Sequence, residues 1–312
     1  MLGRFDAVML AQIEVSRGKR HVLILPPSRV RSESRMADLK PMELGEILDG
    51  ALTIFRHHFG LFAKIGIVAL WLPVALTIYI QLAGGTEQHF ILWFVVQLIA
   101  YFAGLFLTAA AIRVISDSYL GRPPELGEAL SLGASKIWPL FVVGLGKGII
   151  VGLLAAVCGV VIAIAAPAMA GGGAAGVIFV LVAVLGGGWF IAFVLCGYAV
   201  TTPVVVLENL SGAFDAFGRS WELTRTFKRK ILGIAVVAFL IVYVPIMVVA
   251  GLGGYFRIAS PVLGQAIEVV SAALPIVAMP LLSCVFTLMY YDLRVRREAF
   301  DLQILSQQLG IS

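Results

Sequence analysis

Residues 228–252 read KRKILGIAVVAFLIVYVPIMVVAGL. Three cations precede a run from Ile231 to Leu252 that contains no charged residue. A helix needs about 20 apolar residues to cross the hydrocarbon core of a bilayer, so this run predicts a transmembrane helix. Five other runs meet the same requirement. The six predicted spans are Phe59–Leu82, Phe90–Ile112, Trp138–Ala166, Gly176–Val200, Ile231–Leu252 and Ile267–Tyr290. The sequence therefore predicts an all-α, polytopic membrane protein.

The composition favours the same class. Of the 312 residues, 60% are hydrophobic and only 13% are charged, whereas soluble domains carry about 25% charged residues. So few charges cannot coat a water-soluble surface, which excludes a soluble enzyme and a disordered chain. The three cysteines, Cys158, Cys196 and Cys284, lie far apart within apolar runs. They fit neither a disulfide framework nor a metal site, so we expect no metal and no cofactor.

The basic residues predict how the spans are oriented. Twenty of the 23 Lys and Arg residues precede the first span, follow the sixth, or lie between spans two and three or four and five. The alternate loops, 83–89, 167–175 and 253–266, hold only Arg257. Because basic residues remain on the cytoplasmic side, we predict that both termini are cytoplasmic. The net charge of +5 then indicates contact with anionic lipid headgroups at the cytoplasmic face, and we expect no nucleic-acid partner.

The N-terminal segment differs from the rest of the chain. Residues 1–40 are basic, contain Pro26-Pro27, and have apolar runs that are too short for a signal peptide. We predict a disordered arm, with Met36 as an alternative translation start. The other interpretation is a basic arm that contacts anionic lipid. Residues 41–300 are predicted to form a single six-helix membrane domain, and residues 301–312 a short cytoplasmic tail.

A threefold internal repeat organises the predicted domain. Residues 43–48, ELGEIL, recur as ELGEAL at 125–130 and more weakly as LSGAFD at 210–215. Each copy precedes two spans, so we predict three parallel repeats, each an interfacial amphipathic helix followed by a transmembrane hairpin. The repeats cover about 41–119, 120–202 and 203–298. The apolar faces of the short helices either enter the lipid interface or pack on neighbouring spans, and both interpretations remain open.

Four cations are candidates for ligand or lipid contact. Lys147 is the one charge well inside a predicted span. Such a lysine either snorkels to the cytoplasmic surface or contacts a ligand or a lipid phosphate. Lys228, Arg229 and Lys230 directly precede the fifth span. There they would meet anionic headgroups.

Other residues within the spans are interpreted structurally. Gly144, Gly148 and Gly152 recur every fourth residue, a spacing that lets helix backbones approach closely. Pro275 and Pro280 both lie in the sixth span. They make it the best candidate for a broken helix, although a simple kink is the favoured prediction.

Two pairs of motifs carry a family resemblance. Residues 44–49, LGEILD, followed by 55–59, FRHHF, resemble the opening signature of bacterial membrane proteins labelled "glycerophosphoryl diester phosphodiesterase membrane domain". Residues 203–209, PVVVLEN, followed by 219–225, RSWELTR, resemble the same family. The likeness covers roughly residues 41–297, without the catalytic domain found in some relatives. It therefore implies a bacterial inner-membrane protein of about six helices, and it implies no phosphodiesterase activity and no catalytic residue.

The chain offers little for catalysis, because His57 and His58 are its only neighbouring histidines and no nucleophile and acid accompany them. We expect no enzyme. The first hypothesis is a non-catalytic integral protein of the bacterial inner membrane that organises lipid or a membrane-protein partner through its basic cytoplasmic face. The alternative is a transporter or channel for a small or amphiphilic solute. A polar-lined cavity between the spans would favour the alternative, and a solid apolar core would exclude it.

Overall fold

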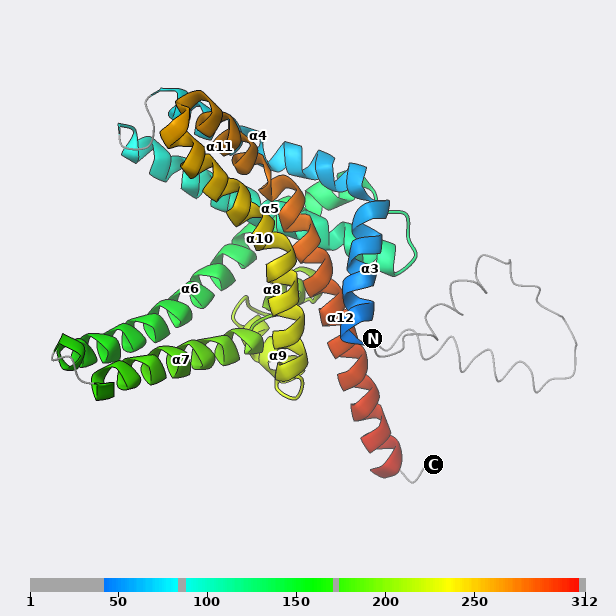
Figure 1. The fold of residues 1–312 in the computed structure, drawn as a ribbon. Coiled ribbons are helices and arrows are strands. Elements are labelled where there is room, and N and C mark those ends of the chain that lie inside the picture. Colours follow the sequence, from blue (N-terminus) through cyan, green and yellow to red (C-terminus); the bar gives the residue numbers. More distant parts are fainter. Residues whose placement is uncertain (1–41, 84–87, 171–173, 309–312) are drawn as a thin grey trace, which may run out of the picture. The chain divides into compact units, whose positions relative to one another are not determined.

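A computed structural model describes residues 42–83, 88–170 and 174–308, which all belong to one compact unit, Lys40–Ser312 (Figure 1). The predicted N-terminal arm lies outside the described residues. The described residues are almost entirely helical and contain no β-strand. In chain order the helices are α3 (Leu44–His57), α4 (Phe59–Leu82), α5 (Phe90–Tyr119), α6 (Leu126–Ala170), α7 (Ala174–Gly197), α8 (Thr201–Leu207), α9 (Asp215–Thr224), α10 (Lys228–Ala259), α11 (Pro261–Ala273) and α12 (Pro275–Gln308).

The described chain has six segments that are long and apolar enough to span a membrane, which confirms the predicted polytopic, all-α class. These are Phe59–Leu82, Phe90–Tyr119, Leu126–Ala163, Ile178–Leu207, Lys228–Ala259 and Val262–Arg297. Most of them extend beyond the predicted apolar runs. Helical hydrogen bonding continues past the last apolar residue wherever no proline, glycine or capping residue ends it.

The second short helix is not separate from its span. The sequence predicts a surface helix near residue 125 and a new span from Trp138, whereas α6 runs continuously from Leu126 to Ala170. The intervening residues are mostly good helix formers. Pro139 lies within this helix, and apolar surroundings tolerate a proline because other groups satisfy the freed carbonyl. The threefold repeat itself stays a prediction.

Pro275 interrupts the helical hydrogen bonding of the sixth span at one residue, Leu274, which keeps helical backbone angles (φ −57°, ψ −35°). The choice between a kink and a broken helix therefore stays a prediction. Helix α11 ends at Ala273 and α12 begins at Pro275. Pro275 has no N–H with which to continue the α11 hydrogen-bond ladder, and its fixed φ suits the first turn of a new helix. The predicted outer loop 253–266 is also helical, because α10 continues to Ala259 and α11 starts after one residue, Ser260.

A close approach of the two helices fixes this hairpin. A Cβ placed on Gly264 of α11 would lie 2.6 Å from the Cα of Arg257 in α10. Only glycine allows the two backbones to pass at this distance. Helix α11 thereby packs along α10 and also contacts α4.

The core lies where α3, α4, α5, α8, α10 and α12 meet, and α12 contacts most of the other helices (Figure 1). Small residues of α5, Ala109 to Ala111, are fully buried there. The apolar windows of α6 and α7 contain no buried residue, whereas those of the other four spans are 17–28% buried. The α6–α7 hairpin therefore presents its apolar side chains outward, as a lipid-facing hairpin does.

The two separate short helices differ in how they pack. Ile47, Ala51 and Phe55 of α3 are buried against the core. At α9 two aromatic side chains are open: Phe214, directly before the helix, is 66% exposed and Trp221 within it is 36% exposed. The face of α3 therefore packs on neighbouring helices, while that of α9 leaves aromatic side chains available to the lipid interface.

Candidate functional site

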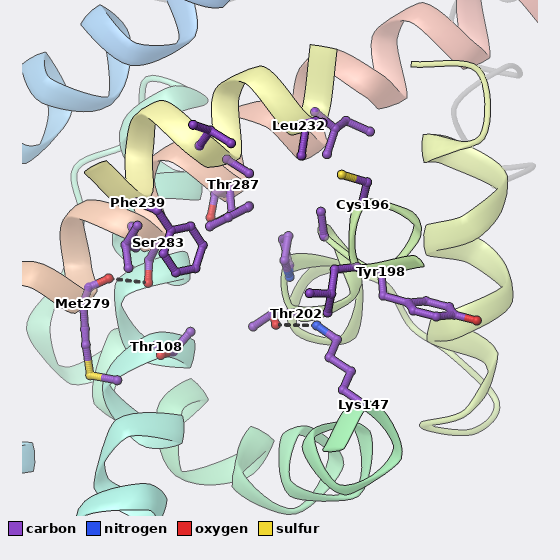
Figure 2. A pocket seen from close by; sticks show the side chains of 18 of the residues that line it. Thr108, Lys147, Cys196, Tyr198, Thr202, Leu232, Phe239, Met279, Ser283 and Thr287 are labelled. Atoms are coloured by element: carbon purple, nitrogen blue, oxygen red, sulfur yellow. Dashed lines mark hydrogen bonds between the residues drawn. The ribbon is translucent and has the colours of Figure 1, made fainter. Parts of the chain in front are cut away.

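A cavity of about 490 Å³ lies between the α6–α8 segment and helices α5, α10 and α12 (Figure 2). We call it the lysine cavity, because Lys147 is the only charged residue among the described residues that line it. Most of its wall is apolar. The larger apolar side chains come from α10, α12 and the end of α7, and include Leu195, Leu232, Phe239, Met279, Leu282 and Phe286. Its volume falls within the range of ligand sites, about 300–1,000 Å³.

Lys147 reaches from α6 toward the start of α8. Its Nζ lies 3.5 Å from the Oγ1 of Thr202, to which it donates a hydrogen bond. Figure 2 shows the ammonium end of the side chain pointing toward the cavity at this contact. No Asp or Glu is among the described lining residues. Among the residues that the structure describes, the cavity wall therefore carries one positive charge and no counter-charge.

Among the hydroxyl groups that also line the cavity, those of Thr108, Ser283 and Thr287 differ in how they are satisfied. Thr108 donates to the carbonyl of Gly104 at 2.8 Å, and Ser283 donates to that of Met279 at 2.9 Å. These bonds to the preceding helical turn are the usual solution in apolar surroundings. The Oγ1 of Thr287 is buried and has no hydrogen-bond partner among the described residues. A buried hydroxyl without a partner is uncommon and requires an explanation.

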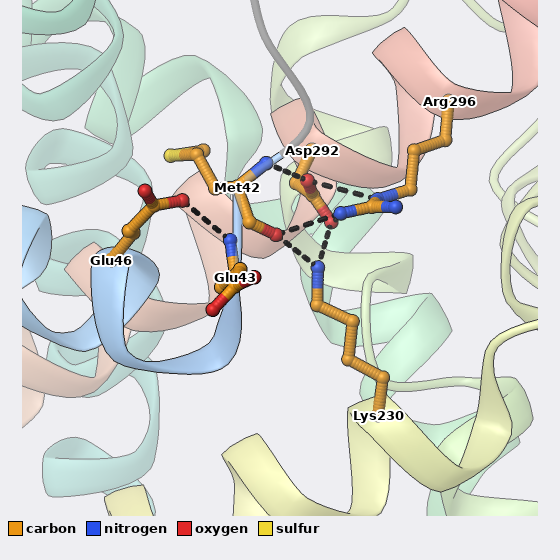
Figure 3. Close-up of polar contacts among 6 residues, drawn as sticks. All are labelled: Met42, Glu43, Glu46, Lys230, Asp292 and Arg296. Atoms are coloured by element: carbon orange, nitrogen blue, oxygen red, sulfur yellow. Dashed lines mark hydrogen bonds and ion pairs between the residues drawn. The ribbon is translucent and has the colours of Figure 1, made fainter.

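A second polar feature lies where α3, α10 and α12 meet (Figure 3). The side chain of Asp292 is fully buried and accepts hydrogen bonds from the Met42 N–H at 2.7 Å, from Lys230 at 2.6 Å and from Arg296 at 3.1 Å. Lys230 and Arg296 also donate to the Met42 carbonyl, at 2.6 and 2.8 Å. We call these four residues the Asp292 cluster. It connects the start of α3 to α10 and α12.

The remaining candidate cations line a basic groove at the start of α10. Its volume is about 550 Å³, and its described lining is Phe193, Arg225, Thr226, Phe227, Lys228, Arg229 and Lys230. The Nζ of Lys228 lies 3.5 Å from the ring centroid of Phe193 and 3.6 Å from that of Trp221, which is cation–π geometry. Arg229 is exposed. The structure thus separates Lys147 from the other three candidates.

The described histidines and acids are the remaining candidate residues. The described residues contain no group of three His, Cys, Asp or Glu side chains that could hold a metal ion. The rings of His57 and His58 are 4.7 Å apart, and the Nε2 of His58 shares a hydrogen bond with the Oγ of Ser118 at 3.0 Å. Burial, and secondarily the charge of His57, lower the pKa of His58 below its ordinary value.

Sequence reasoning did not identify Thr202 or Asp292 as important. Thr202 follows the predicted fourth span and has no unusual local pattern. A local signal did exist for Asp292, because it lies four residues before Arg296 on one helix. Its partners Met42 and Lys230 are distant in the sequence, and no local pattern reveals them.

No protein-family model matches the chain, and comparison with curated proteins and with solved structures gives no significant match. The family resemblance seen in the sequence therefore stays a prediction.

Proposed function

We propose that this chain is a non-catalytic protein of the bacterial inner membrane that organises lipid by binding a lipid-like amphiphile in the lysine cavity. The single observation that carries the proposal is a ligand-sized cavity, with a mainly apolar wall, among helices that are apolar enough to span a membrane. An apolar wall of this extent favours hydrocarbon over a hydrophilic solute, because polar groups lose hydration there without gaining partners.

The basic groove supports the same role. Arg225 and Arg229 are exposed, and no acidic residue is among the described residues that line the groove. Each basic side chain near an anionic membrane surface contributes about 1 kcal/mol to attraction. In the orientation inferred from the basic residues, this groove faces the cytoplasmic leaflet and would collect anionic headgroups.

The test is the lipid that remains bound after purification in a mild detergent. Ala235 lines the cavity on α10, whereas Ala250 on the same helix is exposed and does not. Native mass spectrometry should detect bound lipid on the parent and on Ala250→Phe, and much less on Ala235→Phe. Both variants must elute as a single species in gel filtration. Equal lipid occupancy in the two variants would refute binding in the cavity.

A transporter or channel for an amphiphilic solute is the second candidate. The interruption at Leu274 favours it, because discontinuous helices beside a cavity are typical of transporters. Met279 and Ser283, within the first turns of α12, line the cavity. Proteoliposomes with a fluorescent short-chain lipid distinguish the candidates. Movement across the bilayer that Ala235→Phe abolishes would establish transport, whereas binding without movement supports the first candidate.

A further inference from the structure

We infer that the occupant of the lysine cavity is an anionic amphiphile whose carboxylate or phosphate headgroup binds at Lys147 and Thr202, with its hydrocarbon chain along α10 and α12. This inference rests on the proposed function and specifies the chemical class of the ligand. It depends on three independent features: the charge of the cavity, its unsatisfied hydroxyl and its apolar remainder.

The charge is the first feature. A lysine ammonium has three N–H donors, and Thr202 is the one hydrogen-bond partner that Lys147 has among the described residues. A charge within a membrane segment is costly unless it is paired or reaches water. Since no acid among the described residues lines the cavity, a ligand oxyanion would supply the missing counter-charge and accept the remaining donors.

The hydroxyl of Thr287 is the second feature. Thr108, Ser271 and Ser283 each donate to the carbonyl four residues earlier in their own helix. Thr287 is fully buried, lines the same cavity, and makes no such bond. Because Thr287 is 0% exposed, its hydroxyl would donate to an occupant only after the side chain or its neighbours shift as the ligand enters.

The apolar remainder is the third feature. Val236, Phe239, Met279 and Phe286 present only hydrocarbon, aromatic and thioether surface to the cavity. This surface suits a hydrocarbon chain and offers nothing to a second charged or strongly polar group. One cationic end and a long apolar wall together match a molecule with one acidic end and one chain.

Binding of three ligands with the same hydrocarbon chain tests the inference. The ligands are oleate, 1-oleoyl lysophosphatidate and neutral monooleoylglycerol, and the delipidated protein is titrated with each. Two lysine variants are compared. Lys147→Met removes the charge in the cavity. Lys64→Met removes an exposed charge from α4 that does not line it.

We expect the parent and Lys64→Met to bind both anionic ligands more tightly than the neutral one. Lys147→Met should bind the anionic ligands at least about tenfold more weakly, which corresponds to about 1.4 kcal/mol. Its affinity for monooleoylglycerol should not change, and Lys147→Arg should restore much of the anion preference. A preference for lysophosphatidate over oleate would identify a phospholipid source for the headgroup, and equal affinities would identify any oxyanion on a single chain.

Thr287→Val gives an independent measurement. Replacing an unpaired buried hydroxyl by a methyl group of the same shape should leave the Tm of the ligand-free protein unchanged or raise it. The same change should reduce the Tm increase that oleate or lysophosphatidate produces. A lower Tm without ligand and an unchanged ligand-induced increase would show that the hydroxyl does not serve the ligand.

Two outcomes separate this inference from the proposed function. If all three ligands bind equally and Lys147→Met changes nothing, the anionic headgroup is refuted while an amphiphile site remains. If none of the three binds to the parent, and Ala235→Phe retains as much co-purified lipid as the parent, both the inference and the proposed function fail.

Discussion

Replacing Asp292 by Asn tests how strongly the Asp292 cluster stabilises the membrane domain. The substitution keeps the shape of the side chain and removes its charge, so Lys230 and Arg296 then face a neutral amide. Removing one partner of a buried ion pair costs about 3–5 kcal/mol. The side chains of Lys230 and Arg296 are 20% and 26% exposed, so both cations can turn toward solvent. We therefore expect a loss near the lower bound, about 3 kcal/mol in the free energy of unfolding.

Thermal unfolding in a mild detergent measures this loss. An unfolding entropy of about 2.1 cal/mol/K per residue means that 1 kcal/mol shifts the Tm of a 312-residue chain by about 1.5 °C, so Asp292→Asn should lower Tm by about 4–5 °C. The matched control is Glu128→Gln. It removes the acid of an equally short pair, Arg113–Glu128 at 2.6 Å, whose side chains are 33% and 56% exposed. An exposed pair contributes about 0–1 kcal/mol, so the Tm of this variant should change little.

A double-mutant cycle with Lys230→Met completes the test. Lys230→Met should cost less in the Asp292→Asn background than in the parent, because the interaction between the two side chains is already lost. Equal Tm losses for Asp292→Asn and Glu128→Gln, or additive effects in the cycle, would refute the view that burial makes this cluster a major stabilising contact.

Three further predictions concern pH, packing and topology. Burial lowers the pKa of His58 in the folded state, so the unfolded state takes up the proton more readily. The free energy of unfolding should therefore be highest above pH 6.5 and decrease as the pH falls below that value. Thermal unfolding at several pH values should show a smaller decrease for His58→Gln. Gly264→Ala should lower the free energy of unfolding by about 1–3 kcal/mol, because its new Cβ would lie 2.6 Å from the α10 backbone. Its control is Gly251→Ala, whose Cβ would meet no atom within 4 Å and which should not lower the free energy of unfolding in the same assay. In a chain whose native cysteines are replaced, Arg229→Cys should react with an impermeant thiol reagent only from the cytoplasmic side, and Ser260→Cys only from the outside. Labelling of both positions from one side would contradict the inferred orientation.

The spans could be predicted because the relevant property is local. A run such as Ile231–Leu252 must avoid water along its whole length, and hydropathy alone reveals that requirement. The interruption before Pro275 could not be predicted in the same way. Pro73 and Pro245 lie inside continuous helices, so a proline does not by itself decide between a kink and a break.

The packing around this interruption provides the missing information. A Cβ placed on Gly66 of α4 would lie 2.7 Å from the Cγ2 of Ile276, in the first turn of α12. The close approach of α4 to Ile276 and the packing of α11 on α4 are contacts between segments far apart in the sequence. These tertiary contacts favour two helices that change direction at Leu274, and no local pattern encodes them.

The candidate site shows the same division between local and distant information. Lys147 was identified because a charge inside an apolar run is unusual wherever the run lies. Its surroundings depend on Thr202, 55 residues away, and on α12. Lys230 was predicted as a headgroup contact along with its two neighbours, yet it bonds the buried Asp292, 62 residues away. Membership of a basic run therefore does not determine whether a cation faces lipid or stabilises the fold.

The basic groove and the lysine cavity are adjacent along two helices. On α10, Lys230 lines the groove and Ile231 lines the cavity; on α7, Phe193 lines the groove and Leu195 the cavity. Residues one or two positions apart differ by only about 1.5–3 Å in height along a helix. An anionic headgroup attracted to the exposed Arg229 would therefore lie close to the cavity wall. Long-range attraction at the groove governs how fast a charged ligand arrives, whereas a buried, hydrogen-bonded contact at Lys147 would govern how long it stays. Under the proposed function, the exposed cations of the groove would attract an acidic amphiphile and Lys147, set apart from them, would hold it.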